Sequence, residues 1–90
     1  MENTDRLDEL AEQAHRAVAA QLRAERARAG LTQPELAKLT GLHVTTLSRI
    51  EQGHRAMTLD QLFKIAGALK IDPGDFLNAA QAAVKRELGS

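Results

Sequence analysis

The residues best suited to chemistry lie on one predicted helix surface, between His43 and Gln52. A helix over about Val44–Gln52 would bury Leu47 and Ile50, which lie three residues apart on one face. The opposite face would present hydrogen-bonding groups and one permanently charged guanidinium, that of Arg49. Its residues are His43, Val44, Thr45, Ser48, Arg49 and Gln52. Such a face has little to bury, and its donors and acceptors suit the reading of base edges in the major groove of duplex DNA.

A second short helix is needed to hold this surface in place. The stretch from Gln33 to Thr40 predicts a helix that buries Leu36 and Ala37, and the small Ala37 suits a close crossing of two helices. Gly41 follows it and can adopt the left-handed conformation that reverses the chain in few residues. The two helices and their turn are therefore the stretch around which the rest of the chain is organised.

The remaining chain predicts three more helices. Apolar residues recur at helical spacing through a long first helix, about Thr4–Ala29, which Gly30 ends. Later helix starts are marked by a capping residue with a Glu, Gln or Asp three residues on, at Thr32 with Glu35, Thr58 with Gln61 and Asp72 with Asp75. The last helix runs from Pro73 to about Leu88. Strand signals are absent, so the fold class is all-α with five helices.

The fourth helix, from Thr58 to Leu69, has several apolar residues on its surface. The residues predicted to be buried are Leu59, Leu62, Phe63, Ala66 and Leu69. Gly67 lies inside the same helix, where a glycine costs about 1 kcal/mol relative to alanine. We expect Gly67 to permit close packing.

These features together resemble the helix-turn-helix of the Xre family, which includes the Cro and repressor proteins of lambda-type phages. The resemblance covers about Val18 to Leu77 and rests on the runs LRAERARAGLTQPELAKLTGL, TTLSRIEQG and LFKIAGALKIDPGDFL. It implies a single lambda-repressor-like DNA-binding domain over residues 1–90, with the family core at 17–77 and helical extensions at 1–16 and 78–90. His43 departs from the family, which usually has a small capping residue there, and Val44 stands where many members have Gln.

The resemblance implies which residues face the bases: His43, Val44, Thr45 and Arg49. Arg49 could bond a guanine through its O6 and N7 atoms, although contact with phosphate alone or pairing with an acid are alternatives. Val44 has no polar group and suits a thymine methyl. His43 could touch a base or a phosphate, or be a neutral exposed residue at a helix start. Thr46 is expected to face the interior.

Phosphate contacts are implied for residues around the motif, namely Arg23, Gln33, Ser48, Arg55 and Thr58. Gln33 begins a helix whose free N–H groups attract anions, and Arg55 and Thr58 lie in the loop with which family members commonly grip the backbone. The resemblance also implies that Arg26 and Glu51 form a buried or half-buried ion pair with a structural role.

Charge is unevenly distributed in a chain whose net charge is zero. Five acidic residues and one arginine up to Gln13 give −4, whereas seven basic and three acidic residues from Ala14 to Thr58 give +4. The positive segment contains the motif, which favours a nucleic-acid partner over a chance scatter of surface charges.

Several other classes of function are not expected. There is no cysteine, and the spacings of His15, His43 and His54 match no compact ligand motif, so no metal or other cofactor is predicted. The sequence has no phosphate-binding glycine loop and no Ser–His–Asp set, so we expect neither an enzyme nor a small-molecule ligand. No apolar run is long enough for a membrane span or a secretion leader, which predicts a cytoplasmic protein of a bacterium or phage-infected host.

Both ends of the chain carry apolar stripes. Leu77, Ala80, Val84 and Leu88 lie on one face of the last helix, and the first helix offers Leu7, Leu10 and Ala14. The stripes could pack together within one chain or meet across a two-fold axis. We favour a homodimer, at least on DNA, because one recognition helix reads too few base pairs. A near-palindromic operator would follow.

The sequence therefore predicts a sequence-specific regulator of transcription that binds double-stranded DNA. A phage-type or prophage-type repressor that occludes a promoter is the preferred form. The alternative is a protein-interaction module with the same fold, such as an antitoxin or a co-activator.

Overall fold

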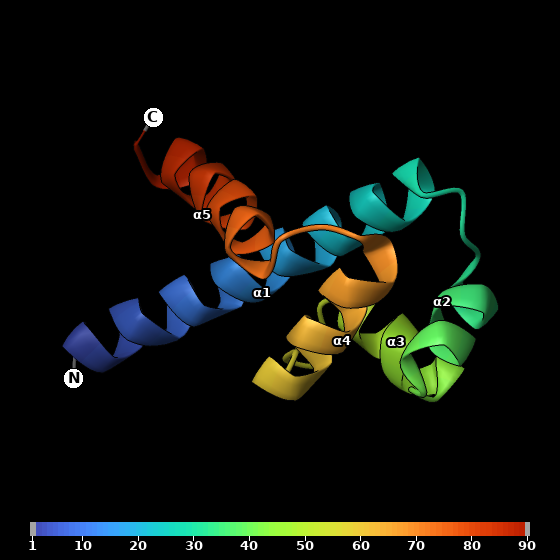
Figure 1. The fold of residues 1–90 in the computed structure, drawn as a ribbon. Helices are drawn as coiled ribbons and strands as arrows, with labels where there is room; N and C mark the ends of the chain where they lie inside the picture. The colour runs from blue at the N-terminus through green and yellow to red at the C-terminus, as the bar shows by residue number, and fades with distance from the viewer. Residues whose placement is uncertain (1, 90) are drawn as a thin grey trace.

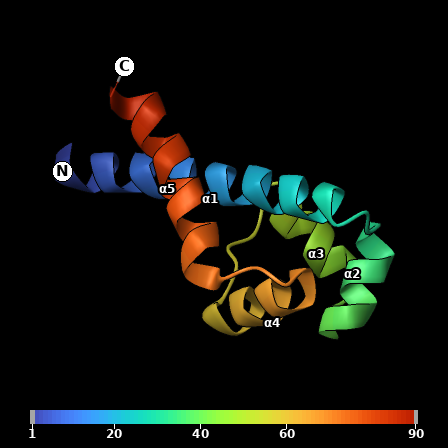
Figure 2. The same ribbon diagram turned by 45° about the horizontal axis from the view of Figure 1, so that its top comes forward.

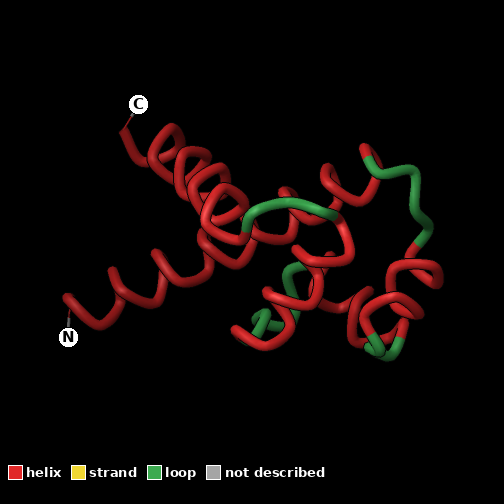
Figure 3. The backbone as a smooth tube through the Cα atoms, viewed as in Figure 1, coloured by secondary structure: helices red, strands yellow, loops and turns green. Residues whose placement is uncertain are grey.

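The structure, a computed structural model, describes the main chain of residues 2–89 and the side chains of residues 5–87. It has five helices: α1 (Glu2–Arg28), α2 (Gln33–Thr40), α3 (Val44–Glu51), α4 (Leu59–Leu69) and α5 (Pro73–Gly89). Figure 3 shows short loops between them and no strand among the described residues. The prediction of an all-α fold with extended first and last helices is confirmed.

The long helix α1 spans a molecule that measures 42 × 22 × 18 Å. In Figures 1 and 2, α5 crosses α1 near its middle, and α2 and α3 lie at the C-terminal end of α1. The N-terminal half of α1 and the C-terminal end of α5 diverge on the opposite side of the molecule. The arrangement separates the helix-turn-helix from the two extensions.

The core lies where α1 to α5 meet. Its buried members are Leu22, Leu36, Ala37, Leu47, Ile50, Leu62, Ile65, Leu69 and Phe76. Leu36 and Ala37 of α2 and Leu47 and Ile50 of α3 are all within it, as their spacing predicts. The apolar faces of the two motif helices are thus covered, and α3 must present its other face outward.

Local signals in the sequence set the helix ends. The hydroxyl of Thr32 accepts from the N–H of Glu35, while the carboxylate of Glu35 accepts from the N–H of Thr32 at 2.8 Å. Thr58 and Gln61 form the same capping box at α4. Gly41 lies in the left-handed region with φ of 77°, which permits the tight turn between α2 and α3.

The predicted buried face of α4 was partly wrong. Leu59 and Phe63 are 71% and 63% exposed, whereas Ile65, which was not predicted, is 1% exposed. The buried face follows Leu62, Ile65, Ala66 and Leu69, and a helix cannot bury Leu59 and Phe63 on that same face. The prediction for Gly67 was also wrong, because it is exposed and no atom lies within 4 Å of where its Cβ would be.

The stripe on α5 is mostly covered by the chain itself. Ala80 and Val84 are 4% and 8% exposed because α5 packs against α1. Of the two arrangements considered for the stripes, packing within one chain is therefore present, and this buried pair is not available to a second copy. Leu77 remains 43% exposed. The side chain of Leu88 lies outside the described residues.

Candidate nucleic-acid interface

The exposed face of α3 carries the residues predicted to read bases. His43 is the N-cap residue with φ of −68° and ψ of 141°, and its side chain makes no capping hydrogen bond. Val44, Thr45 and Arg49 are exposed, and Ser48 is half-buried. The opposite face holds buried residues of the core, so these side chains form the outer surface of a helix fixed from behind.

Arg49 has no hydrogen-bond or ion-pair partner among the described residues. Pairing with an acid, one of the alternatives for this residue, is therefore absent from the part of the chain that the structure describes. The guanidinium of Arg49 is exposed on a helix whose opposite face is buried, so all of its donors remain available to an external acceptor. A guanine edge and a phosphate are the two acceptors of duplex DNA that this fork matches.

A cluster of hydrogen-bonded side chains holds the C-terminal end of α3. Arg26 of α1 donates from Nε to Oε2 of Glu51 at 2.7 Å and from Nη2 to Oε1 at 2.9 Å. The third donor, Nη1 of Arg26, reaches the carbonyl oxygen of Leu31 at 2.9 Å. The predicted ion pair is thus present and two-pronged, and its hydrogen bond with Glu51 raises the pKa of Arg26. Glu51 itself is only 2% exposed.

Two residues predicted to contact phosphate also take part in this cluster. Nε2 of Gln33 donates to Oε1 of Glu51 at 3.0 Å, and Nη1 of Arg23 donates to the main-chain carbonyl of Glu51. Helices α1 and α2 are thereby tied to the end of α3. The sequence shows these residues as polar but not which acceptor holds them, because the partner lies 18 or 28 residues away. Their remaining polar atoms could still reach DNA.

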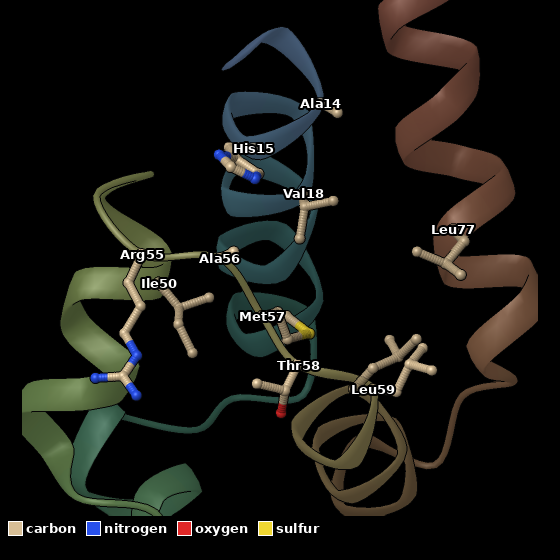
Figure 4. Close-up of a pocket in the computed structure, with 11 residues that line it drawn as sticks. Ala14, His15, Val18, Ile50, Arg55, Ala56, Met57, Thr58, Leu59 and Leu77 are labelled. Atoms are coloured by element: carbon tan, nitrogen blue, oxygen red, sulfur yellow. The ribbon is translucent and has the colours of Figure 1, made fainter. Parts of the chain in front are cut away.

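The loop between α3 and α4 offers the other predicted phosphate contacts. Arg55 and Thr58 are exposed, and Arg55 has no partner among the described residues. Figure 4 shows the guanidinium of Arg55 and the hydroxyl of Thr58 at the lower edge of a cleft, away from Ala14. The hydroxyl oxygen of Thr58 accepts from the N–H of Gln61 at 3.1 Å, so its own proton remains free for a phosphate oxygen.

Sequence reasoning missed two basic residues near the end of α3. Gly53 has φ of 77°, and the N–H of His54 bonds the carbonyl of Arg49 at 3.0 Å, which ends α3 against α1. A polar pocket of about 450 Å³ at this junction is lined in part by Arg16 and His54. In the sequence, Arg16 contributes only to the positive charge of its segment, and His54 is only one of three histidines whose spacing matches no metal-binding motif. Across the described residues, no group of three or more metal-binding side chains gathers, and no helix has the length and apolarity needed to cross a membrane.

A comparison with known protein families also identifies a helix-turn-helix in this chain. A family model described as helix-turn-helix matches residues 22–76, which is more than half of the chain. The chain belongs to the Xre-type helix-turn-helix family. Members of this family are DNA-binding regulators of transcription, and the matched residues include all of α2 and α3. No match was found among curated proteins.

Solved structures of other helix-turn-helix regulators are similar to this one. The clp gene regulator ClgR from Corynebacterium glutamicum has a TM-score of 0.79 and 28% identity over 84% of this chain and 81% of its own. The restriction-modification controller protein C.AhdI from Aeromonas hydrophila has a TM-score of 0.67 and 34% identity, covering 69% and 94%. A point mutant of the restriction-modification controller protein C.Esp1396I has a TM-score of 0.71 and 25% identity, covering 79% and 95%.

Proposed function

We propose that this Xre-type protein binds a specific duplex DNA site as a homodimer and represses transcription by occluding a promoter. The operator would be near-palindromic, because two copies related by a two-fold axis present the same recognition helix to each half-site. We further propose the cytoplasm as the location and a prophage or phage as the genetic setting. The similar structures are regulators of bacterial genes and of restriction-modification systems, so a chromosomal setting is the alternative.

The observation that carries the DNA-reading role is the contrast between the two faces of α3. On the buried side of α3, the carboxylate of Glu51 accepts hydrogen bonds from Arg26 of α1 and Gln33 of α2. In front, Thr45 and Arg49 are exposed, and Arg49 has no internal partner among the described residues. A recognition helix needs this combination, because fixed donors discriminate bases only if the helix cannot shift to accept the wrong pair.

Substitution of Arg49 tests base reading directly. We expect Arg49→Ala to lose about 1–3 kcal/mol of affinity for the preferred site and to relax its preference at one base pair. Arg49→Lys is the matched variant, since it keeps the charge but not the two-pronged fork. If Arg49 reads guanine, Lys fails to restore the preference. Equal losses on preferred and random DNA, with full recovery in Arg49→Lys, would assign Arg49 to phosphate.

The rival protein-interaction module can be separated by salt dependence. A protein that neutralises several phosphates on random duplex DNA shows a logarithmic slope of about −0.9 per contact. We expect Arg55→Ala to reduce the magnitude of this slope by about one unit on every sequence, with exposed Lys64 of α4 substituted by Ala as a control. Binding that shows no salt dependence would favour an antitoxin or co-activator instead. If the salt dependence shows DNA binding, selection from random duplexes would identify the operator and its symmetry.

A further inference from the structure

The polar pocket of about 450 Å³ where α1 passes the C-terminal end of α3 has no role in the contacts described so far. Three of its lining residues come from α1 and three follow α3. They are Glu12, His15, Arg16, Gln52, Gly53 and His54. The three residues of α1 precede residue 22, where the match to the family model begins. The pocket is therefore completed by the N-terminal extension of α1, which the family core does not include.

The turn after α3 holds the side chain of Arg16 in this pocket. The Cα and Cγ atoms of Arg16 each lie 3.9 Å from the position that a Cβ of Gly53 would occupy, so the arginine stem runs against the main chain of the turn. Arg16 is nevertheless exposed, and it has no hydrogen-bond or ion-pair partner among the described residues. Its stem is thus supported while its charged head faces solvent, with all five N–H donors available.

The pocket adjoins the surface proposed to bind DNA at two places. The side-chain amide of Gln52 donates to the hydroxyl of Ser48 on the outer face of α3 at 3.3 Å. His54 directly precedes Arg55 in the loop between α3 and α4. Figure 4 shows His15, which also lines the pocket, on the same side of the view as Arg55. A DNA backbone that reaches Arg55 therefore continues toward the pocket.

The side chains of the pocket select an anion. Arg16 offers a planar charged fork that matches a phosphate, and His54 offers a ring N–H donor. A metal ion is not suited, because no group of three or more metal-binding side chains gathers among the described residues. Glu12, one turn before Arg16 on α1, is the acidic residue of the lining, and the segment up to Gln13 has a net charge of −4. Phosphate is thus attracted at Arg16 and repelled beyond it.

We propose that this pocket binds one further phosphate of the DNA backbone, next to those contacted by Arg55 and Thr58. Arg16 supplies the charged fork and His54 a second donor, while Glu12 marks where the DNA-binding surface ends along α1. The contact extends the footprint beyond what residues 22–76 of the family core can reach. This inference rests on the proposed DNA-binding function and adds a contact whose strength does not depend on base sequence.

The salt dependence of binding to a random-sequence duplex tests this contact. We expect Arg16→Ala to weaken binding several-fold and to reduce the magnitude of the logarithmic salt slope by about one unit. Arg6→Ala is the matched control, because Arg6 is exposed on the same helix about 15 Å before Arg16, and both quantities should stay unchanged. Glu12→Gln should tighten binding. Equal effects of the two arginine variants, or no gain in Glu12→Gln, would overturn the proposal.

Phosphate ethylation interference on a duplex selected by the wild-type protein locates the contact. We expect one interfering phosphate to disappear in Arg16→Ala while those lost in Arg55→Ala remain. An identical pattern in wild type and Arg16→Ala would overturn the proposal. A wild-type protein that binds no duplex would instead contradict the proposed function itself.

A titration with inorganic phosphate separates the DNA backbone from a free anion as the source of the phosphate. The full chain without DNA is titrated, and the NMR signals of the His54 ring are followed. We expect no saturable shift, because the pocket is open and one phosphate makes few contacts without the rest of the DNA. Saturable binding would assign the pocket to a small free anion and overturn the proposal.

Discussion

The ion pair behind the recognition helix leads to a prediction about unequal partners. Glu51 is 2% exposed at its side chain, whereas the side chain of Arg26 is 20% exposed. In Arg26→Ala the carboxylate stays buried with Gln33 as its remaining side-chain donor. In Glu51→Ala the guanidinium keeps its bond to the carbonyl of Leu31 and can turn its other donors toward water. Arg26→Ala should therefore destabilise the fold more than Glu51→Ala.

The size of the difference follows from burial. Leaving a buried charge without its partner costs about 3–5 kcal/mol, and Gln33 places Arg26→Ala near the lower end of that range. Glu51→Ala mainly loses hydrogen bonds to a charged group that can rehydrate, which costs about 1.5–3 kcal/mol. A chain of this size is stable by only about 5–13 kcal/mol in total. Since 1 kcal/mol shifts Tm by about 4–8 °C, Arg26→Ala should lower it by at least about 12 °C.

Urea and thermal unfolding of both single variants and the double variant measure these quantities. Lys38→Ala is the control, because Lys38 is exposed on α2 and has no partner among the described residues, and it should change stability by less than about 0.5 kcal/mol. The double variant should be more stable than the sum of the single effects predicts. A larger loss of stability in Glu51→Ala than in Arg26→Ala, or a loss in Arg26→Ala no larger than in Lys38→Ala, would refute this prediction.

Three further predictions concern helix ends and the core. Lys70 ends α4 with φ of 59°, so Lys70→Gly should raise the free energy of unfolding by about 1 kcal/mol, and a lower Tm would contradict this. The N–H and hydroxyl of Thr32 lower the pKa of Glu35; its support for α2 is thus present at neutral pH and lost as the pH falls below about 4. Glu35→Gln should flatten that part of the stability profile, and an unchanged profile would show that Glu35 does not contribute. Leu47 is fully buried, so Leu47→Ala should cost about 2–5 kcal/mol in urea unfolding, whereas a loss below about 1 kcal/mol would mean the core closes over the gap.

Much of the fold could be predicted because its signals are local. Thr32 with Glu35 and Thr58 with Gln61 mark helix starts by side-chain reach within one turn. Gly30 and Gly41 mark helix ends because both adopt positive φ. The two motif helices bury the faces that their spacing indicates. At the helix ends, the sequence neighbours that create the signal are also the residues that make the contact.

The errors arose where the decision depends on distant residues. On α4, apolar residues occupy more than one face, and only the packed neighbours decide that Ile65 is buried and Phe63 is exposed. The left-handed end of that helix at Lys70 has no glycine to signal it. Likewise, Arg23 and Gln33 could be recognised as polar residues near the motif, but their bonds to Glu51 depend on how three helices meet.

The buried stripe of α5 changes how dimerisation must be tested. Val84 is 8% exposed against α1, so Val84→Asp would place a charge inside the chain's own interior and would destabilise the fold. A loss of DNA binding by that variant could not be assigned to a lost dimer. Leu7 and Leu77 are exposed, and substitutions there act on the surface without opening the core.

The same separation of surface from core applies to the recognition helix itself. Val44, Thr45 and Arg49 are exposed and are not part of the core, while Leu47 and Ile50 are buried and face no DNA. Exposed positions away from caps and buried networks usually change stability by less than about 0.5 kcal/mol. Under the proposed function, the preferred operator can therefore change through the outer face of α3 at little cost in folding, because Glu51 and its partners fix the helix from its other side.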